Sequence, residues 1–115
     1  MTDFTSTVAR IRAFRDARDW MQFHNPKNLA ISISLEASEL LEHFQWKSME
    51  ESDAHAKAAK GEIAEEIADI TVYLLEMADN LGIDLLSAID AKLTKNEAKY
   101  PVAKARGSAV KYTEL

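Results

Sequence analysis

The sequence EIAEEIADITVYLLEMADNL, at residues 62–81, carries the strongest structural signal in this chain of 115 residues. Large apolar residues recur along it at helical spacing, the pattern of a core face: Ile63, Ile67, Ile70, Leu74 and Met77. The opposite side is also apolar, with Ala64, Ala68, Val72 and Leu75. A helix that is apolar nearly all round must be covered on both sides, so we expect a second subunit to cover one of them.

Capping and breaking residues divide the rest of the chain into further helices. Asn25-Pro26 interrupts a helix, because proline disfavours helix at the preceding residue and is favoured at a helix start. Gly82 fits a C-terminal stop and Asp84 a following N-cap. These signals predict helices at about 5–23 (capped by Thr5, Ser6 or Thr7), 26–46, 48–81 (capped by Ser48 or Ser52) and 84–99. We therefore predict an all-α, four-helix bundle-like subunit, one domain over residues 1–115 with an irregular tail at about 101–115.

Composition narrows the class of protein. The chain has no Cys, which excludes disulfides and thiolate metal sites. Its net charge of −5 argues against binding a nucleic acid polymer, whose phosphates attract Lys and Arg. No apolar run approaches the ~18 residues of a membrane-spanning helix, and no apolar signal segment is visible at the N-terminus. We expect a cytoplasmic protein without a membrane partner.

Two pairs of acidic residues share one spacing. Glu36 and Glu39 are three residues apart, as are Glu66 and Asp69, so each pair projects from one face of a helix. Both pairs border apolar positions, where a carboxylate without a counter-charge is costly. Mg²⁺ takes oxygen ligands and typically binds carboxylates together with substrate phosphates. The pattern indicates a Mg²⁺ site; the alternative is that these acids are ordinary solvated charges on helix surfaces.

These acidic motifs, EASE at 36–39 and EEIAD at 65–69, resemble the E-x-x-E…E-x-x-D signature of the all-α NTP pyrophosphohydrolases, which include MazG proteins and dimeric dUTPases. Other segments are similar to the dCTP pyrophosphatase branch: RDW at 18–20, FH at 23–24, PKNL at 26–29, FQWK at 44–47, YP at 100–101, RGSA at 106–109 and KYT at 111–113. The resemblance covers nearly the whole chain from about residue 8. It implies a MazG-like fold and Mg²⁺-dependent cleavage of a nucleoside triphosphate to a monophosphate and pyrophosphate, a housecleaning of the nucleotide pool.

The resemblance also implies roles for individual residues. The expected Mg²⁺ ligands are Glu36, Glu39, Glu66 and Asp69. The residues expected to build the base and sugar pocket are Trp20, His24 and Trp46, and those expected near the phosphates are Tyr73, Lys92 and Asn96. Water is expected to attack the α-phosphorus. Its proton would pass to a carboxylate, for which Glu39 and Glu65 are equal candidates.

Several of these residues also have purely structural interpretations. Trp20 and Trp46 could be core residues, since Trp is largely buried on average, and Lys92 could be a surface charge. His43 lies on the same helical side as Glu36 and Glu39. It could orient a metal ligand or simply pack, whereas His55 lies in a polar segment and is assigned no role.

Substrate and assembly are expected from the resemblance. dCTP or a modified dCTP is the expected substrate, with dUTP, modified nucleotides or a broad base preference as the alternative. Vertebrate members carry a His on the first helix where this chain has Ile11, which leaves the details of base recognition open. The related enzymes are tetramers of two dimers, so a homotetramer is expected, with a dimer as the fallback. The alternative of a different class is a helical oligomerisation or adaptor module without activity.

Overall fold

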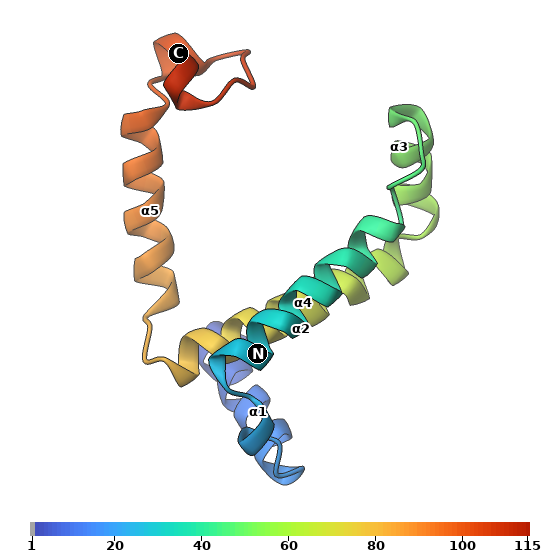
Figure 1. Ribbon diagram of the computed structural model, residues 1–115, viewed down its shortest axis with the longest axis vertical. Helices are drawn as coiled ribbons and strands as arrows, with labels where there is room; N and C mark the ends of the chain where they lie inside the picture. Colours follow the sequence, from blue (N-terminus) through green and yellow to red (C-terminus); the bar gives the residue numbers. More distant parts are fainter. Residues whose placement is uncertain (1) are drawn as a thin grey trace. The chain divides into compact units, whose positions relative to one another are not determined.

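The computed structural model describes residues 2–115, which form helices and turns and no β-strand, as the all-α prediction requires (Figure 1). The elements are α1 (Phe4–Ala17), the 3₁₀ turn η1 (Met21–Phe23), α2 (Pro26–Glu42), α3 (Met49–Ala58), α4 (Lys60–Asn80), α5 (Leu85–Lys99), α6 (Val102–Ala105) and the 3₁₀ turn η2 (Tyr112–Glu114). They form two compact units, one extending to Leu81 and the other Gly82–Leu115. That both units serve one domain stays a prediction.

The first unit is built on α2 and α4, which run side by side along most of their length (Figure 1). Both α1 and α3 contact α4. The buried apolar side chains come from three of these helices: Val8 from α1, Leu29 from α2 and Ala78 from α4. Leu29, only 1% exposed, follows the Asn25-Pro26 helix start by one turn, so the start of α2 is anchored in the core.

Polar contacts join α1 to the end of α4. Both Nε and Nη2 of Arg12 donate to the Asp79 carboxylate, at 2.7 and 2.6 Å, and this pairing lowers the pKa of Asp79. Arg15 is buried and donates through Nη1 to Asn80 Oδ1 at 2.7 Å. Two-pronged Arg–carboxylate contacts fix geometry as well as charge, so α1 is held in one orientation against α4.

The first helix differs from the prediction at both ends. Its N-cap is Asp3, which accepts from the Ser6 amide while Ser6 accepts from the Asp3 amide in a capping box; the predicted caps, Thr5 to Thr7, lie inside the helix. It ends at Ala17 rather than near Phe23, because Asp19 adopts a φ of 53°. That left-handed conformation ends a helix, and Asp is among the few residues that tolerate it.

The predicted third helix is divided into α3 and α4. Ser48 caps α3 in a capping box with Glu51, but the helix stops at Ala58 and α4 starts at Lys60 after an irregular Ala59. No large apolar residue lies between Met49 and Ile63, so no core packing holds the two segments in one line. The predicted end of α2 was also late, since residues 43–46 form a turn.

The other predicted boundaries are confirmed. Asn25 caps α2 with Pro26 as the first helical residue, and Asp84 caps α5. Gly82 follows the end of α4 with a φ of +68°, a conformation that favours glycine.

The second unit contains more regular structure than predicted. The tail expected to be irregular forms α6 and η2. Its Tyr112 ring lies edge-on to Tyr100, with centroids 6.0 Å apart, and Lys99 Nζ lies 4.9 Å from the same ring. These aromatic and cation–π contacts hold the chain end against the end of α5.

The apolar stripe of α4 is only partly covered within the chain. Ile63, Ile70 and Met77 are half-buried, whereas Ile67 is 51% exposed and Leu74 is 45% exposed. The last two are seven residues apart and share one face of the helix. No helix within residues 2–115 is long and apolar enough to cross a membrane.

Candidate functional site

Three carboxylates converge between α2 and α4. Glu36 and Glu39 lie on successive turns of α2, and Glu66 reaches the same place from α4. Each offers one oxygen, and these three oxygens all lie within 4.8 Å of one another. The arrangement is suited to a cation, because carboxylates so close together repel one another without a counter-charge.

The electrostatics of this cluster also favour a bound cation. Oε2 of Glu36 and Oε2 of Glu66 are buried and have no hydrogen-bond partner within residues 2–115. Loss of solvent raises the pKa of Glu36, and neighbouring Glu39 raises it further. The pKa of Glu66 is raised by the same two causes in the same order. A divalent cation would compensate the unpaired oxygens and the repulsion together.

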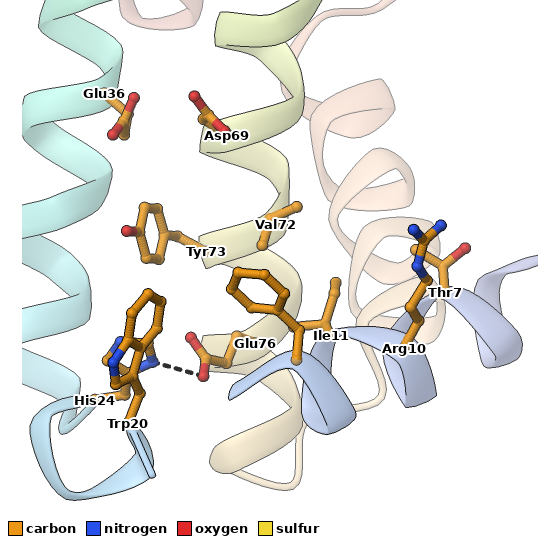
Figure 2. Close-up of a pocket in the computed structure, with 11 residues that line it drawn as sticks. Thr7, Arg10, Ile11, Trp20, His24, Glu36, Asp69, Val72, Tyr73 and Glu76 are labelled. Carbon is orange, nitrogen blue, oxygen red and sulfur yellow. Dashed lines mark hydrogen bonds and ion pairs between the residues drawn. The ribbon is translucent and has the colours of Figure 1, made fainter. Parts of the chain in front are cut away.

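Asp69 lies beside this cluster. It is one helical turn beyond Glu66 on α4, is exposed, and is outside the group of three converging oxygens. Figure 2 shows its carboxylate and that of Glu36 facing each other across the space between α4 and α2. Asp69 therefore stays a predicted ligand, placed where the cluster opens into a pocket.

This pocket has a volume of about 490 Å³ and is formed by α1, the segment before α2, α2 and α4. Its lining residues are Thr7, Arg10, Ile11, Phe14, Trp20, His24, Glu36, Asp69, Val72, Tyr73 and Glu76. Four of them form a series of neighbouring rings. The centroids are 5.6 Å apart from Phe14 to Trp20, 6.1 Å from Trp20 to His24 and 6.3 Å from His24 to Tyr73. Rings of this kind offer stacking faces to a nucleobase.

The turn after α1 positions two of these rings. The Trp20 amide donates to the Arg15 carbonyl at 3.1 Å, which returns the chain towards α1 after Asp19. Asn28 Nδ2 then donates to the Phe23 carbonyl at 2.9 Å, which ties η1 to the start of α2. These two hydrogen bonds hold Trp20 and His24 on the pocket side. The turn that they stabilise can form because α1 ends at Ala17.

The pocket contains a carboxylate that the sequence analysis missed. Glu76 is 3% exposed, and its Oε1 lies 2.7 Å from His24 Nδ1 and 3.9 Å from Arg15 Nε. A signal was available, because Glu76 follows Tyr73 by three residues and Asp69 by seven and therefore shares their helix face.

A second, smaller cavity of about 360 Å³ also borders the cluster. It is lined by Glu39, Glu42, His43, Lys47, His55 and Glu66. Here His43 Nδ1 and His55 Nε2 are 2.9 Å apart, which joins the end of α2 to α3. His43 was expected either to orient a metal ligand or simply to pack. The contact of its Nδ1 with His55 supports the packing role.

Within the first unit, two other predicted site residues lie outside the pocket. Trp46 is 88% exposed in the turn after α2. Glu65 is exposed on α4 and lines neither cavity. Lys92 and Asn96 belong to the second unit, where they are one turn apart on α5. The roles of all four stay predictions.

The fold and the site together define a class: an all-helical protein with a carboxylate cluster suited to a divalent cation and an aromatic pocket beside it. Comparison with known proteins makes the class specific. The chain belongs to the MazG-like family, whose model matches residues 31–115.

Individual relatives agree with this assignment. The chain is 42% identical over 111 residues to a mouse protein named dCTP pyrophosphatase 1 and 39% identical to the human protein of that name. Both matches cover 94% of this chain, which spans 65% of the length of each relative. Among solved structures, a pyrophosphatase from Archaeoglobus fulgidus matches with a TM-score of 0.83 and 45% identity, over 88% of this chain and 94% of that one.

Proposed function

We propose that this chain is a Mg²⁺-dependent pyrophosphohydrolase that cleaves a nucleoside triphosphate to its monophosphate and pyrophosphate. The observation that carries the proposal is the cluster of Glu36, Glu39 and Glu66, which has two buried and unpaired oxygens and opens beside a pocket walled by aromatic rings. A hard cation held by the cluster would bind the phosphates of a nucleotide, and the aromatic rings of the pocket would stack on its base.

The three clustered carboxylates fit a divalent cation, and we propose that they hold Mg²⁺ together with Asp69. The ion would screen the phosphate charge and make water a better nucleophile. Glu39 is exposed whereas Glu36 and Glu66 are half-buried, so Glu39 is the one most open to incoming water.

For the base that accepts the proton of the attacking water, membership of the cluster supports Glu39 over Glu65. In this proposal Tyr73 donates a hydrogen bond to the substrate. Its pKa is raised by loss of solvent and then by Glu36. The phenol thus stays protonated at neutral pH, where it can donate to a phosphate oxygen.

The proposed substrate is dCTP or a modified dCTP. The name of the mammalian relatives supports it, as does the pocket in which Trp20 and His24 adjoin Tyr73. The proposed assembly is a homotetramer, or failing that a dimer, and its support is the exposed apolar face of α4. The proposed setting is the cytoplasmic nucleotide pool.

The test is a panel of deoxynucleoside and nucleoside triphosphates incubated with the protein in Mg²⁺ and in EDTA, with the products separated by chromatography. We expect monophosphate and pyrophosphate in Mg²⁺ and neither in EDTA. Release of inorganic phosphate would contradict the proposed bond cleavage. No turnover of any triphosphate would favour an oligomerisation module instead.

A further inference from the structure

Glu76 is a buried charge that the proposed chemistry does not use. It lies in the pocket, and its Oε1 is 2.7 Å from His24 Nδ1 (Figure 2). The same oxygen is 3.9 Å from Arg15 Nε. Burying a carboxylate is tolerated when it is paired in this way. The pairing explains how Glu76 is accommodated but leaves open what its other oxygen does.

That second oxygen is available to a ligand. Within residues 2–115 the hydrogen bond to Glu76 comes from His24 and reaches Oε1, not Oε2. The fully buried polar atoms that lack a hydrogen-bond partner do not include Glu76 Oε2, so this oxygen is not shut off from its surroundings. Since Glu76 lines the pocket, this acceptor is open to the pocket interior.

The spacing along α4 suits a nucleoside between Glu76 and the cluster. Asp69 and Glu76 are seven residues apart, roughly 10 Å along the helix at 1.5 Å per residue. Tyr73 lies between them, and Figure 2 shows Trp20 and His24 at the Glu76 end. This interval is comparable with the length of a nucleoside from its 5′ oxygen to the far edge of its base. With the phosphates at Asp69, the far edge of the base meets Glu76.

At that edge a carboxylate discriminates between bases. The exocyclic amine of cytosine donates hydrogen bonds, and Glu is a natural acceptor for it. Uracil and thymine present a carbonyl oxygen at the same position. That oxygen would face the carboxylate oxygen with neither group able to donate, and an unsatisfied buried polar group is costly.

We propose that Glu76 is a specificity-determining residue that selects an amino-bearing base, cytosine over uracil or thymine, through a hydrogen bond from the exocyclic amine to its Oε2. The inference rests on the proposed function, because it assumes that a nucleoside triphosphate occupies this pocket.

The experiment compares kcat/KM for dCTP and dUTP in the wild type and in Glu76→Gln. The amide keeps an acceptor for His24 but can also turn its NH₂ group towards a carbonyl. We expect the dCTP to dUTP ratio to fall about 10- to 100-fold, the range of a good base contact. The matched control is Asp79→Asn, which neutralises another Arg-paired carboxylate on α4 that does not line the pocket. It should leave the ratio unchanged.

The outcomes separate the two proposals. An unchanged ratio in Glu76→Gln overturns the role of Glu76 and leaves the proposed function intact. A wild type that prefers dUTP overturns the role of Glu76 and the proposed substrate, but leaves the proposed pyrophosphohydrolase activity intact. A wild type that hydrolyses no triphosphate overturns the proposed function itself. If Glu76→Gln does not fold, Glu76→Asp keeps the charge but withdraws it by one methylene. It should also lose the preference for dCTP, and a retained preference would overturn the inference.

Discussion

Glu36 on α2 and Glu66 on α4 approach each other across the helix pair, with one oxygen of each within 4.8 Å of the other. The Oε2 atom of each residue is buried and has no hydrogen-bond partner within residues 2–115. A pair of like charges held in this way destabilises the protein until a cation joins it. Without a cation, the carboxylates that the proposed chemistry needs as ligands therefore lower the stability of the folded protein.

Neutralising a ligand should abolish turnover and leave the fold intact. Glu39→Gln and Asp69→Asn keep the size of the side chain but remove a charge from the proposed Mg²⁺ site. We expect kcat/KM to fall at least about 100-fold, the scale of losing one charge-stabilising contact in an active site. Steady-state kinetics measures the loss and far-UV circular dichroism should remain helical. Glu50→Gln, which neutralises an exposed residue of α3, is the control, and wild-type rates in either site variant would refute the assignment.

The same residues predict a stability that depends on pH. The pKa of Glu66 is raised in the metal-free fold, chiefly by loss of solvent. The protonated form is then favoured by folding, so its stabilising contribution is complete below the unfolded value of 4.5 and is lost as pH rises through the folded pKa. We expect Glu66→Gln to melt at a higher temperature than the wild type in EDTA at pH 8, with the difference shrinking towards pH 4.

Thermal unfolding followed by circular dichroism measures this effect. Mg²⁺ should raise the melting temperature of the wild type at pH 8 by binding the folded state and should have little effect on Glu66→Gln. Equal melting temperatures for the two proteins in EDTA at pH 8 would show that the repulsion is relieved without a metal.

Much of this arrangement could be predicted from the sequence, because its signals are local. The caps at Asn25 and Asp84 depend on residues a few positions away, and the two acidic pairs depend on helical spacing. The predictions that failed were those that depend on tertiary contacts. The division at Ala59 reflects missing core contacts, and Glu76 gains its meaning only when Arg15 and His24 reach it from elsewhere in the chain.

The turn at Asp19 is an intermediate case. A sequence rich in helix formers predicts that α1 continues through Trp20, and only the left-handed conformation of Asp19 redirects it. Had the helix continued, Trp20 would follow the face set by helical periodicity instead of lying against Phe14 and His24. A single backbone angle therefore decides the composition of the pocket wall.

Trp46 should affect substrate binding more than the chemical step. Its side chain is almost wholly exposed, so Trp46→Ala should fold normally. If Trp46 stacks on the base, the contact exists in both ground and transition states, and its loss raises KM with kcat little changed. We expect KM to rise about 10-fold, in the range of one base–aromatic contact. An unchanged KM would mean that this Trp does not bind the nucleotide, and a collapse of kcat would mean that it is more than a stacking surface.

Assembly should depend on the uncovered side of α4. Ile67 and Leu74 lie on one face and are about half exposed, although the length and apolar character of α4 are those of a buried helix. Closed symmetric oligomers are the usual way to cover such a surface, with dimers commonest and dihedral tetramers next. Leu74→Glu would place an unpaired charge in the proposed interface and should shift the mass from tetramer towards smaller species with helicity retained. Multi-angle light scattering at fixed concentration measures the mass. A monomeric, active wild type would refute the assembly, and an unchanged mass in Leu74→Glu would move the interface to another face.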